Sequence, residues 1–299
     1  MKMILTGTGT SHGIPVIGCN CAVCTSKDPK DNRLRCSAWI FDPVSILIDV
    51  GPEFRIQALK YKITKPQAVF ITHSHADHLH GIDDLRIFSH STPPTSPVYN
   101  KKHEAHIKGL KVYANDRCAK DIAKRFDYIF TPTKEGGGKP KIEIISTKEH
   151  EAEFPLSLKN IQVTPVPLMH GSLEDMGLLF TETKNDGTKK SIAYLTDCSF
   201  ISDKSINLIK ERCGVLEHLV IDGLKPTPHS THFSYEQALE AADRLNAKNT
   251  YLTHMAHNLS HKQLSEYIDA VIPKFKNLKR NVEEGGSASP AYDGLILKI

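Results

Sequence analysis

Imidazole and carboxylate groups are concentrated in one short stretch of this 299-residue sequence. His73, His75, Asp77 and His78 lie together, directly after the short apolar run Gln67–Thr72. In an extended chain His73 and His75 point to the same side. Asp77 and His78 then fall at the start of the next predicted helix. Imidazole and carboxylate are suitable ligands for Zn²⁺, Mn²⁺ or Fe. Because so many ligands crowd a single ion, the pattern predicts two ions that share them.

Three further candidate ligands, His170, Asp197 and His254, each stand directly after an apolar, strand-like run. An active site built at one edge of stacked sheets would show this repeated order of strand and ligand. The alternative interpretation is that these side chains lie on the surface or cap the core. The His-X-His-X-Asp-His spacing favours the metal interpretation, because it arises rarely by chance.

Three of the seven cysteines, Cys19, Cys21 and Cys24, form a second cluster. An extracellular disulfide framework would not place three cysteines together and leave one over, whereas in a reducing compartment such a cluster binds metal. A closed zinc site needs four ligands, and His257, shortly after His254, is the candidate fourth. The alternative is three reduced core cysteines. The remaining cysteines are isolated, and we expect them to be small buried side chains: Cys36, Cys118, Cys198 and Cys213.

The elements that position these side chains belong to a soluble globular chain. Hydrophobic residues make up 39% of the sequence and charged residues 24%, which excludes disordered, collagen-like and coiled-coil proteins. The net charge of +4 is too small to indicate nucleic-acid binding by itself. No apolar run approaches the roughly 18 residues of a membrane span, and the start of the chain turns to Gly and Thr too early for a signal peptide. We therefore expect a cytoplasmic protein that does not bind a membrane.

Apolar runs and turn signals predict strands in both halves of the chain, and each half ends in helices. The expected strands are 1–5, 37–41, 45–50, 67–72, 112–113, 142–146, 160–166, 177–182, 191–196, 217–221, 249–253 and 294–299. The expected helices are 52–61, 76–88, 116–126, 234–246 and 260–270. Residues 89–109 are polar and contain prolines, so they are expected to form a surface excursion. Because no linker separates the halves, we expect one domain over 1–299, with two packed sheets and helices outside.

The motif at 73–78 resembles the hallmark of the metallo-β-lactamase-fold hydrolases, and the resemblance extends from Leu5 to Gly294. It implies an α/β fold, the αββα four-layer sandwich, with a dinuclear metal site. The resemblance divides the ligands into two groups that share one carboxylate: His73, His75 and His170 for one ion, Asp77, His78 and His254 for the other, and Asp197 as the bridge. Asp49 matches the first motif of the family and would orient the ligands from behind. The alternative for Asp49 is a turn at the end of a strand.

The cysteine cluster narrows this resemblance. Together with Thr6-Gly7-Thr8-Gly9 and the pair His254 and His257, it is similar to the phosphoribosyl 1,2-cyclic phosphate phosphodiesterases. That branch implies a structural zinc, with these ligands here: Cys19, Cys21, Cys24 and His257. It also implies a dinuclear site that often holds manganese. The tRNA 3′-end endonuclease branch is similar as well, but this chain has cysteines where that branch has a Pro/Arg/Asn motif.

Two metal ions suit the hydrolysis of a phosphodiester. A hydroxide that bridges them is a nucleophile at neutral pH, and the ions stabilise charge on the phosphoryl oxygens. The leaving oxygen then needs a general acid, for which His232 is the candidate, and Asp77 could orient the nucleophile. The resemblance also implies a catalytic histidine in the loop that holds His232. We interpret His229 as a rim histidine, and Arg86 as a partner of Asp83 rather than of a substrate phosphate.

The sequence therefore predicts a metal-dependent phosphodiesterase that hydrolyses a small cyclic phosphodiester, such as a phosphoribosyl or nucleoside cyclic phosphate. The alternatives are a tRNA 3′-end-type endoribonuclease, a thioester or other hydrolase on the same fold, and a zinc-stapled binding module with a vestigial site. The expected cofactors are two divalent ions, Mn, Zn or Fe, and one structural zinc. RNA is the less favoured substrate, and the oligomeric state stays open, with a homodimer as one option.

Overall fold

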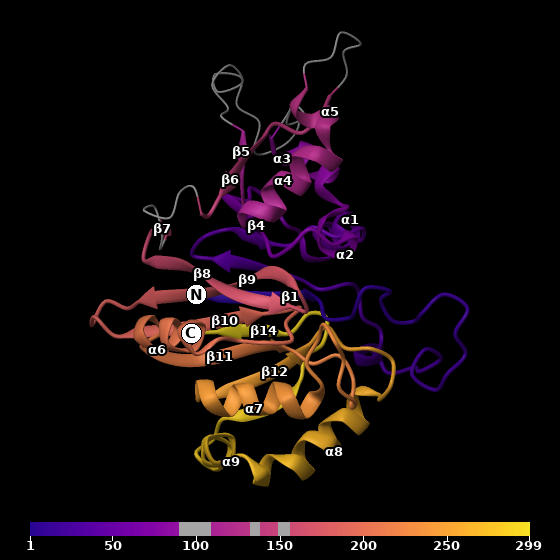
Figure 1. The fold of residues 1–299 in the computed structure, drawn as a ribbon, viewed down its shortest axis with the longest axis vertical. Helices are drawn as coiled ribbons and strands as arrows, with labels where there is room; N and C mark the ends of the chain where they lie inside the picture. Colours follow the sequence, from indigo (N-terminus) through magenta and orange to yellow (C-terminus); the bar gives the residue numbers. More distant parts are fainter. Residues whose placement is uncertain (90–108, 132–137, 149–155) are drawn as a thin grey trace.

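Two mixed β-sheets lie face to face, and helices cover the outer side of each (Figure 1). This computed structural model describes residues 1–89, 109–131, 138–148 and 156–299. The arrangement is an αββα sandwich, so the predicted fold class is confirmed. The surface excursion predicted at 89–109 lies outside the described residues, apart from its first and last residue.

The first sheet comes mainly from the N-terminal half of the chain. Its strands, in spatial order, are β14 (Ile296–Lys298), β1 (Lys2–Gly7), β2 (Ser37–Asp42), β3 (Ile46–Ile48), β4 (Ala68–Ile71), β5 (Leu110–Ala114) and β6 (Ile142–Ser146). The helical elements of this half are η1 (Pro29–Asp31), α1 (Phe54–Tyr61), α2 (Ala76–Leu79), η2 (Ile82–Leu85), α3 (Arg86–Ser89), α4 (Asp116–Arg125) and α5 (Asp127–Phe130). From β3 to β6 neighbouring strands run parallel, so their carboxyl ends share one edge of the sheet.

The second sheet is built from the C-terminal half. Its strands, in spatial order, are β13 (Ser287–Pro290), β12 (Asn249–Thr253), β11 (Val215–Asp222), β10 (Lys189–Leu195), β9 (Leu173–Thr183), β8 (Ile161–His170) and β7 (Leu156–Leu158). The helical elements of this half are α6 (Asp203–Arg212), α7 (Tyr235–Leu245), α8 (His261–Val271), η5 (Ile272–Lys274) and α9 (Lys276–Glu283). The strands β10 to β13 run parallel, and their carboxyl ends also meet at one edge.

The strand β4 shows why the segment before the histidine motif is apolar throughout. Val69 and Ile71 belong to the core between the first sheet and its helices, whereas Ala68 and Phe70 belong to the core between the two sheets. Successive side chains of a strand point to opposite faces, so a strand that is buried on both faces carries no alternation. The rigid, doubly buried strand then delivers the motif to the edge of the sheet.

The helix predicted over 76–88 is interrupted, and in this respect the prediction was wrong. The chain forms α2, η2 and α3 in succession instead. A side chain at Gly81 would place its Cβ 2.1 Å from the carbonyl oxygen of Gly51, and the Gly81 amide donates to the Val50 carbonyl at 2.8 Å. The backbone therefore turns at Gly81 to pack closely on the loop that follows β3.

The helices α6 and α9 were not predicted from the sequence, whereas α7 and α8 were. The helix α9 has only two apolar residues, Leu278 and Val282, and of these it buries only Leu278, so the sequence there shows no apolar run. In contrast, α7 and α8 each begin with a capping box, Ser234 with Gln237 and Ser260 with Gln263. Such a box satisfies amide groups that have no partner within the helix and marks the first turn in the sequence.

The isolated cysteines are buried, as predicted: Cys36, Cys118, Cys198 and Cys213. Among the described residues, no helix combines the length and the apolar character that crossing a lipid bilayer requires.

Candidate metal centre

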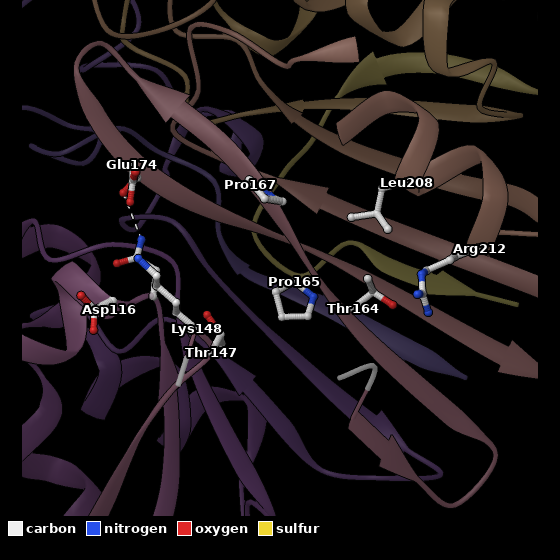
Figure 2. Close-up of a pocket in the computed structure, with 10 residues that line it drawn as sticks. Asp116, Thr147, Lys148, Thr164, Pro165, Pro167, Glu174, Leu208 and Arg212 are labelled. Atoms are coloured by element: carbon white, nitrogen blue, oxygen red, sulfur yellow. Dashed lines mark hydrogen bonds between the residues drawn. The ribbon is translucent and has the colours of Figure 1, made fainter. Parts of the chain in front are cut away.

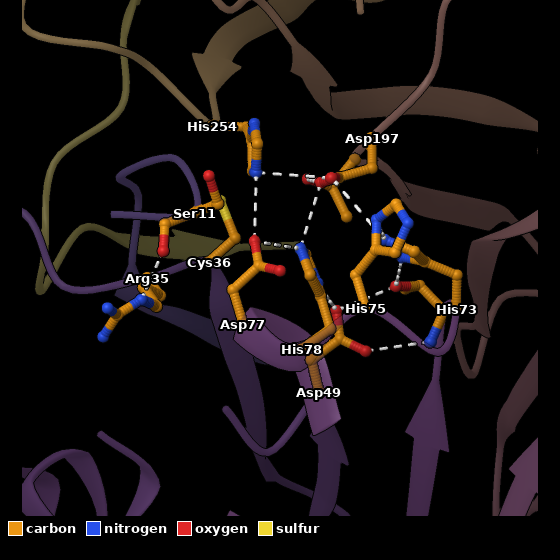
Figure 3. Close-up of polar contacts among 12 residues, drawn as sticks. Ser11, Arg35, Cys36, Asp49, His73, His75, Asp77, His78, Asp197 and His254 are labelled. Atoms are coloured by element: carbon orange, nitrogen blue, oxygen red, sulfur yellow. Dashed lines mark hydrogen bonds and ion pairs between the residues drawn. The ribbon is translucent and has the colours of Figure 1, made fainter. Parts of the chain in front are cut away.

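The candidate ligands meet where strands of both sheets end. His73 follows β4, and His170 is the last residue of β8. Asp197 and His254 follow the parallel strands β10 and β12 at the shared edge of the second sheet. The sheet pairing therefore brings together residues that lie far apart in the sequence (Figure 3).

The first group of ligands consists of His73, His75 and His170. One ligand atom from each lies within 4.8 Å of the others. The Nε2 atom of His73 lies 2.9 Å from Nδ1 of His75. The Nδ1–H group of His170 donates to the carbonyl oxygen of Thr231 at 2.6 Å, which leaves Nε2 as a free acceptor. His73 and His170 are buried, and His75 is exposed at the mouth of the site.

The second group consists of Asp77, His78, Asp197 and His254, whose ligand atoms also lie within 4.8 Å of one another. Asp197 Oδ1 lies 3.3 Å from His78 Nε2, and Asp197 Oδ2 lies 3.3 Å from His254 Nε2. The same Oδ2 lies 3.8 Å from Nε2 of His73, in the first group. The carboxylate of Asp197 thus faces both groups, as Figure 3 shows.

The donor atoms of the second group fit a cation. The Nε2 atoms of His78 and His254 are buried and have no hydrogen-bond partner among the described residues. Buried polar atoms without a partner are rare in folded proteins, because each costs roughly 1–3 kcal/mol. His78 donates from Nδ1 to Asp49 at 2.7 Å, so its Nε2 lone pair points at the centre of the group. A divalent ion would satisfy both orphaned nitrogens.

Asp49 lies behind the ligands, where the resemblance placed it. Its carboxylate accepts hydrogen bonds from the amide of Thr72 at 2.8 Å and from the hydroxyl of Thr72 at 3.0 Å, in addition to His78. Asp49 is fully buried. Its hydrogen bonds join Thr72, at the end of β4, to His78 in α2 and so fix these two segments relative to each other. Burial, the largest influence, raises the pKa of Asp49, although His78 and Thr72 lower it.

Three residues of this centre adopt a backbone conformation that is unusual for residues other than glycine. The φ angles are 60° at Asp49, 51° at Asp197 and 58° at His254. Left-handed residues of this kind are tolerated where the surrounding structure enforces them, and they cluster at functional sites. Here each one turns the chain sharply at the end of a strand.

The buried carboxylates of the centre favour a positive charge among them. Burial opposes the charged form of His78, but Asp197, Asp77 and Asp49 together raise its pKa well above the ordinary value. Burial likewise opposes ionisation of Asp77, but His78 and His254 lower the pKa of Asp77 overall. The buried carboxylates thus stabilise any nearby cation, whether a proton on His78 or a metal ion.

His232 lies beside both groups, and the sequence did not reveal its partner. Asp222, the last residue of β11, approaches His232 Nδ1 to 3.2 Å and accepts the amide of Phe233 at 2.9 Å. The ring of His232 stacks on His254 with centroids 4.6 Å apart and lies 4.5 Å from the ring of His170. Burial, the largest single influence, lowers the pKa of His232, but the hydrogen bond and charge of Asp222 together with the charge of Asp197 outweigh it, so the net shift of the pKa is upward.

Asp222 and Asp175 are the residues that sequence reasoning missed. Asp175, fully buried on β9, places Oδ1 3.6 Å from Nδ1 of His73. Asp222 follows an apolar strand in the same way as Asp197, so the same pattern could have found it. Asp175 follows the exposed Glu174 and opens the buried run of β9, and a charge at the start of a buried run is also a signal, since buried charges need a purpose or a partner.

The structure places the other two predicted side chains at the periphery. Arg86 forms an ion pair with Asp83, to which the hydroxyl of Tyr128 also donates, at 2.6 Å. This geometry agrees with the interpretation of Arg86 as a structural partner of Asp83. His229 is exposed, and its ring lies 5.5 Å from that of His232, at the rim of the centre.

The three clustered cysteines and His257 form a separate Cys₃His site. The sulfur atoms lie 3.5, 3.4 and 3.3 Å from Nδ1 of His257, for Cys19, Cys21 and Cys24 respectively. The Val16 amide donates to the Cys24 sulfur at 3.3 Å. The amide of Cys24 donates to the sulfur of Cys21 and, with His257, lowers the pKa of Cys21 to about 6. Three thiolates and one imidazole in contact are the donor set of a closed structural zinc site.

Two hollows lie along β8, and neither is lined by a candidate ligand. One, of about 350 Å³, lies between Lys148 and Arg212 and is bordered by Pro165 of β8 (Figure 2). The other, of about 460 Å³, shares part of this lining and extends to Met169 and Asp175. The ligand cluster, with its orphaned nitrogens and shifted pKa values, identifies the chemical site instead.

Several known proteins are similar to this chain in sequence and in fold. Residues 45–255 match the family model described as the Beta-lactamase superfamily domain. The chain is 31% identical over 293 residues to the octanoyltransferase of Porphyromonas gingivalis, across 96% of this chain but 52% of that relative. The chain thus spans about half the length of that protein. It is 25% identical over 296 residues to ribonuclease Z of Staphylococcus aureus (strain MSSA476), across 90% of this chain and 94% of that enzyme.

A crystal structure of a new diphosphatase from the PhnP family has the same fold, with a TM-score of 0.75. It is 32% identical in sequence, and the match covers 99% of this chain and 96% of that one. The resemblance inferred from the motifs is therefore confirmed. The chain belongs to the beta-lactamase superfamily, as a metallo-β-lactamase-fold hydrolase of the PhnP branch.

Proposed function

We propose that the chain is a dinuclear metal-dependent phosphodiesterase that hydrolyses a small cyclic phosphodiester, such as a phosphoribosyl or nucleoside cyclic phosphate. The observation that carries this proposal is the carboxylate of Asp197, which faces both ligand groups while His232 lies beside them. One ion would be held by His73, His75 and His170, the other by Asp77, His78 and His254, with Asp197 shared. When bound, the ions lower the pKa of water and stabilise negative charge on phosphoryl oxygens.

The side chains of the protein supply the proton transfer. When the P–O bond to the leaving group breaks, the protonated His232 donates from Nε2 to the leaving oxygen, which departs as an alcohol. Asp222 stabilises the protonated imidazole through Nδ1 and keeps Nε2 directed toward the ligand groups. Asp77 belongs to the second group, where its carboxylate can orient the attacking water.

Two of the relatives support a phosphorus-centred reaction. The structure at 32% identity is that of a diphosphatase, and the ribonuclease Z relative cleaves a nucleic acid. The Cys₃His site favours the small-substrate branch over the endonuclease branch, which has a Pro/Arg/Asn motif in that place. The octanoyltransferase relative makes a thioester hydrolase the second candidate, because the match extends over 96% of this chain.

Phosphorus NMR of the Mn²⁺-loaded protein would test the proposal. The substrate mixture contains phosphoribosyl 1,2-cyclic phosphate, a 2′,3′-cyclic nucleotide, a 3′,5′-cyclic nucleotide and a short 3′-extended RNA. We expect one cyclic phosphate signal to disappear well ahead of the others, and this signal identifies the ring. The thioester hydrolase, the second candidate, is tested by adding an octanoyl thioester to the same preparation and measuring the release of the free thiol.

Two variants make this experiment specific. His232→Ala should lose about 10²-fold or more in turnover, the usual contribution of a general acid. His218→Ala is the matched control, since His218 is a buried histidine on β11 that donates from Nε2 to the carbonyl oxygen of Lys298 rather than contacting any ligand. Cleavage of the RNA alone would replace the proposal with the endonuclease activity. A fully metal-loaded protein that changes no phosphorus signal would exclude a phosphodiesterase.

The remaining expectations accompany this proposal. We propose that the dinuclear site takes Mn²⁺ or Zn²⁺, or Fe, because mixed imidazole and carboxylate ligands accept all three. We place the protein in the cytoplasm, where thiols stay reduced and can bind zinc. A small phosphodiester is the proposed partner, RNA is the less favoured one, and no membrane is involved. A homodimer is the oligomeric option that sedimentation would test.

A further inference from the structure

We infer that the Cys₃His site holds His254 in position and thereby sets the affinity of the dinuclear centre for its second ion. This inference rests on the dinuclear site of the proposed function. It concerns His257 as a positioning residue, since His257 contacts the cysteine sulfurs and neither ligand group.

His254 and His257 lie three residues apart in the turn segment that follows β12. His254 reaches into the second group, where its Nε2 lies 3.3 Å from Asp197 and 3.6 Å from Asp77. Its φ angle of 58° is disfavoured for a residue with a side chain, and such a conformation persists only where its surroundings enforce it. The position of this ligand therefore depends on what restrains the turn.

Three kinds of contact restrain the turn, and one of them, the hydrogen bond of 2.8 Å from the Ala256 amide to the Leu224 carbonyl, comes from outside the cysteine loop. The amide of Met255 donates to the Thr8 carbonyl at 3.1 Å, and the Met255 carbonyl accepts the amide of Thr10 at 3.1 Å. His257 then ends the turn among the three sulfurs of the Cys₃His site, each within 3.5 Å of its Nδ1. Thr8 and Thr10 lead directly into the cysteine segment, so the other two restraints depend on the same loop.

The loop that carries the cysteines has little secondary structure of its own. Between β1 and β2 its one regular element is the short turn η1. The loop is closed at its base, where Ile14 and Arg33 exchange backbone hydrogen bonds of 2.8 Å in both directions. A long loop of this kind gains its order from a cross-link, and a structural zinc supplies one by joining the three cysteines to His257.

The consequence is unequal for the two ions. His254 belongs to the second ligand group and not to the first. The first group, His73, His75 and His170, is held by β4 and β8. Loss of the Cys₃His site should therefore weaken binding of the second ion and leave binding of the first ion unchanged.

The test is the variant Cys21→Ser, in which one thiolate of the site is lost. Mass spectrometry of metals gives the zinc content, and titration with Mn²⁺ followed by electron paramagnetic resonance distinguishes isolated ions from coupled pairs. We expect the variant to lose zinc, to bind the first Mn²⁺ as the wild type does, and to bind the second about tenfold or more weakly. Its spectrum at intermediate Mn²⁺ should be that of isolated ions.

Two further variants keep the outcome interpretable. Cys213→Ser makes the same chemical change at a buried cysteine that caps α6, and it should leave both Mn²⁺ affinities unchanged. Cys21→His restores a zinc ligand and should restore the second affinity, even if Cys21→Ser folds poorly. A zinc-free Cys21→Ser protein with two wild-type affinities would overturn the inference, as would equal weakening of both. Failure of the wild type to hydrolyse any phosphodiester would overturn only the proposed function.

Discussion

At the scale of single residues, the pair of Asp222 and His232 decides how the centre handles protons. Burial alone would lower the pKa of His232, but the Asp222 carboxylate, at 3.2 Å from Nδ1, raises it. A general acid is active while it is protonated, so turnover falls as the pH rises through this pKa. The raised pKa keeps His232 protonated further into the neutral range than an ordinary histidine.

The substitution Asp222→Asn should therefore move the alkaline limb of kcat to lower pH. The neutral amide no longer stabilises the imidazolium, so His232 loses its proton earlier as the pH rises. The pH dependence of kcat for the best cyclic substrate measures this shift. A substrate with a good leaving group, bis(p-nitrophenyl) phosphate, is the control, because its phenolate needs little protonation. An unchanged alkaline limb would show that His232 is not the acid. Metal analysis checks that His254, whose Nδ1 lies 3.7 Å from Asp222, still binds its ion.

At the scale of elements, α4 supports the histidine motif from the side. The hydroxyl of Ser74 donates to Asp121 at 2.6 Å, and Arg125 donates to the carbonyl oxygen of Ser74. Ser74 stands between His73 and His75, so α4 holds the backbone that carries both imidazoles. Such outer contacts commonly account for 10–100-fold in metal affinity, in rough terms.

The substitution Asp121→Ala should weaken binding of the first ion by about tenfold. The variant removes the hydrogen bond from Ser74 to Asp121, so the backbone that positions His73 and His75 becomes more mobile. Competition with a chromophoric chelator measures the affinity. Asp116→Ala is the matched control on the same helix, because Asp116 pairs with the exposed Lys120 rather than with the motif. Equal affinities for the two variants would contradict a role of α4 in the site.

The loop after β3 packs on the motif helix so closely that glycine is required. A Cβ atom at Gly51 would lie 1.9 Å from the carbonyl oxygen of Asp77. Gly51→Ala should displace the Asp77 segment and lower the free energy of unfolding by about 2–4 kcal/mol, as overpacking and lost ligand geometry combine. Chemical denaturation measures the change. Gly187→Ala, where no atom lies within 4 Å, should cost only about 1 kcal/mol from its positive φ. Similar losses at both positions would argue against the close packing.

At the scale of the whole molecule, the metal centre joins the two sheets. The motif comes from the end of β4 in the first sheet, and Asp197 and His254 come from the second. Ions held between them would act as a cross-link between the halves. Such ions would also offset the repulsion among the buried carboxylates of Asp49, Asp77 and Asp197.

Removal of metal by a chelator should therefore lower Tm. A ligand at a free concentration of 100 Kd stabilises the folded state by about 2.7 kcal/mol per site. For a chain of this size we expect Tm to fall by roughly 5 °C or more and to recover on addition of Mn²⁺ or Zn²⁺. Differential scanning calorimetry with and without chelator measures the change. A Tm that is independent of metal would contradict a site shared by the two sheets.

The elements that could be predicted are those whose signals are local. The strand β12 and the helices α7 and α8 have clear periodicity, and the two helices also have capping boxes. The helices α6 and α9 were missed, and neither begins with a capping box that would mark its first turn. The break at Gly81 was also missed, since its cause is the distant Gly51 rather than its neighbours.

The sequence by itself determined which residues have metal-binding chemistry and where strands deliver them. The spacing of His73, His75, Asp77 and His78 needs no tertiary contact to be recognised, because four ligands in so short a segment have no common structural explanation. The position of His170, Asp197 and His254 after apolar runs is equally local. These patterns, together with the clustered cysteines, also identified the family.

Only the tertiary structure decided which side chains face one another. Asp222 pairs with His232, and Asp175 lies beside His73. The Asp197 carboxylate lies between two ligand groups, at distances that no spacing in the sequence encodes. The physical reason is that sheet pairing and the packing of the two halves, both long-range and cooperative, set these distances, whereas the sequence pattern reports only the local periodicity of each element.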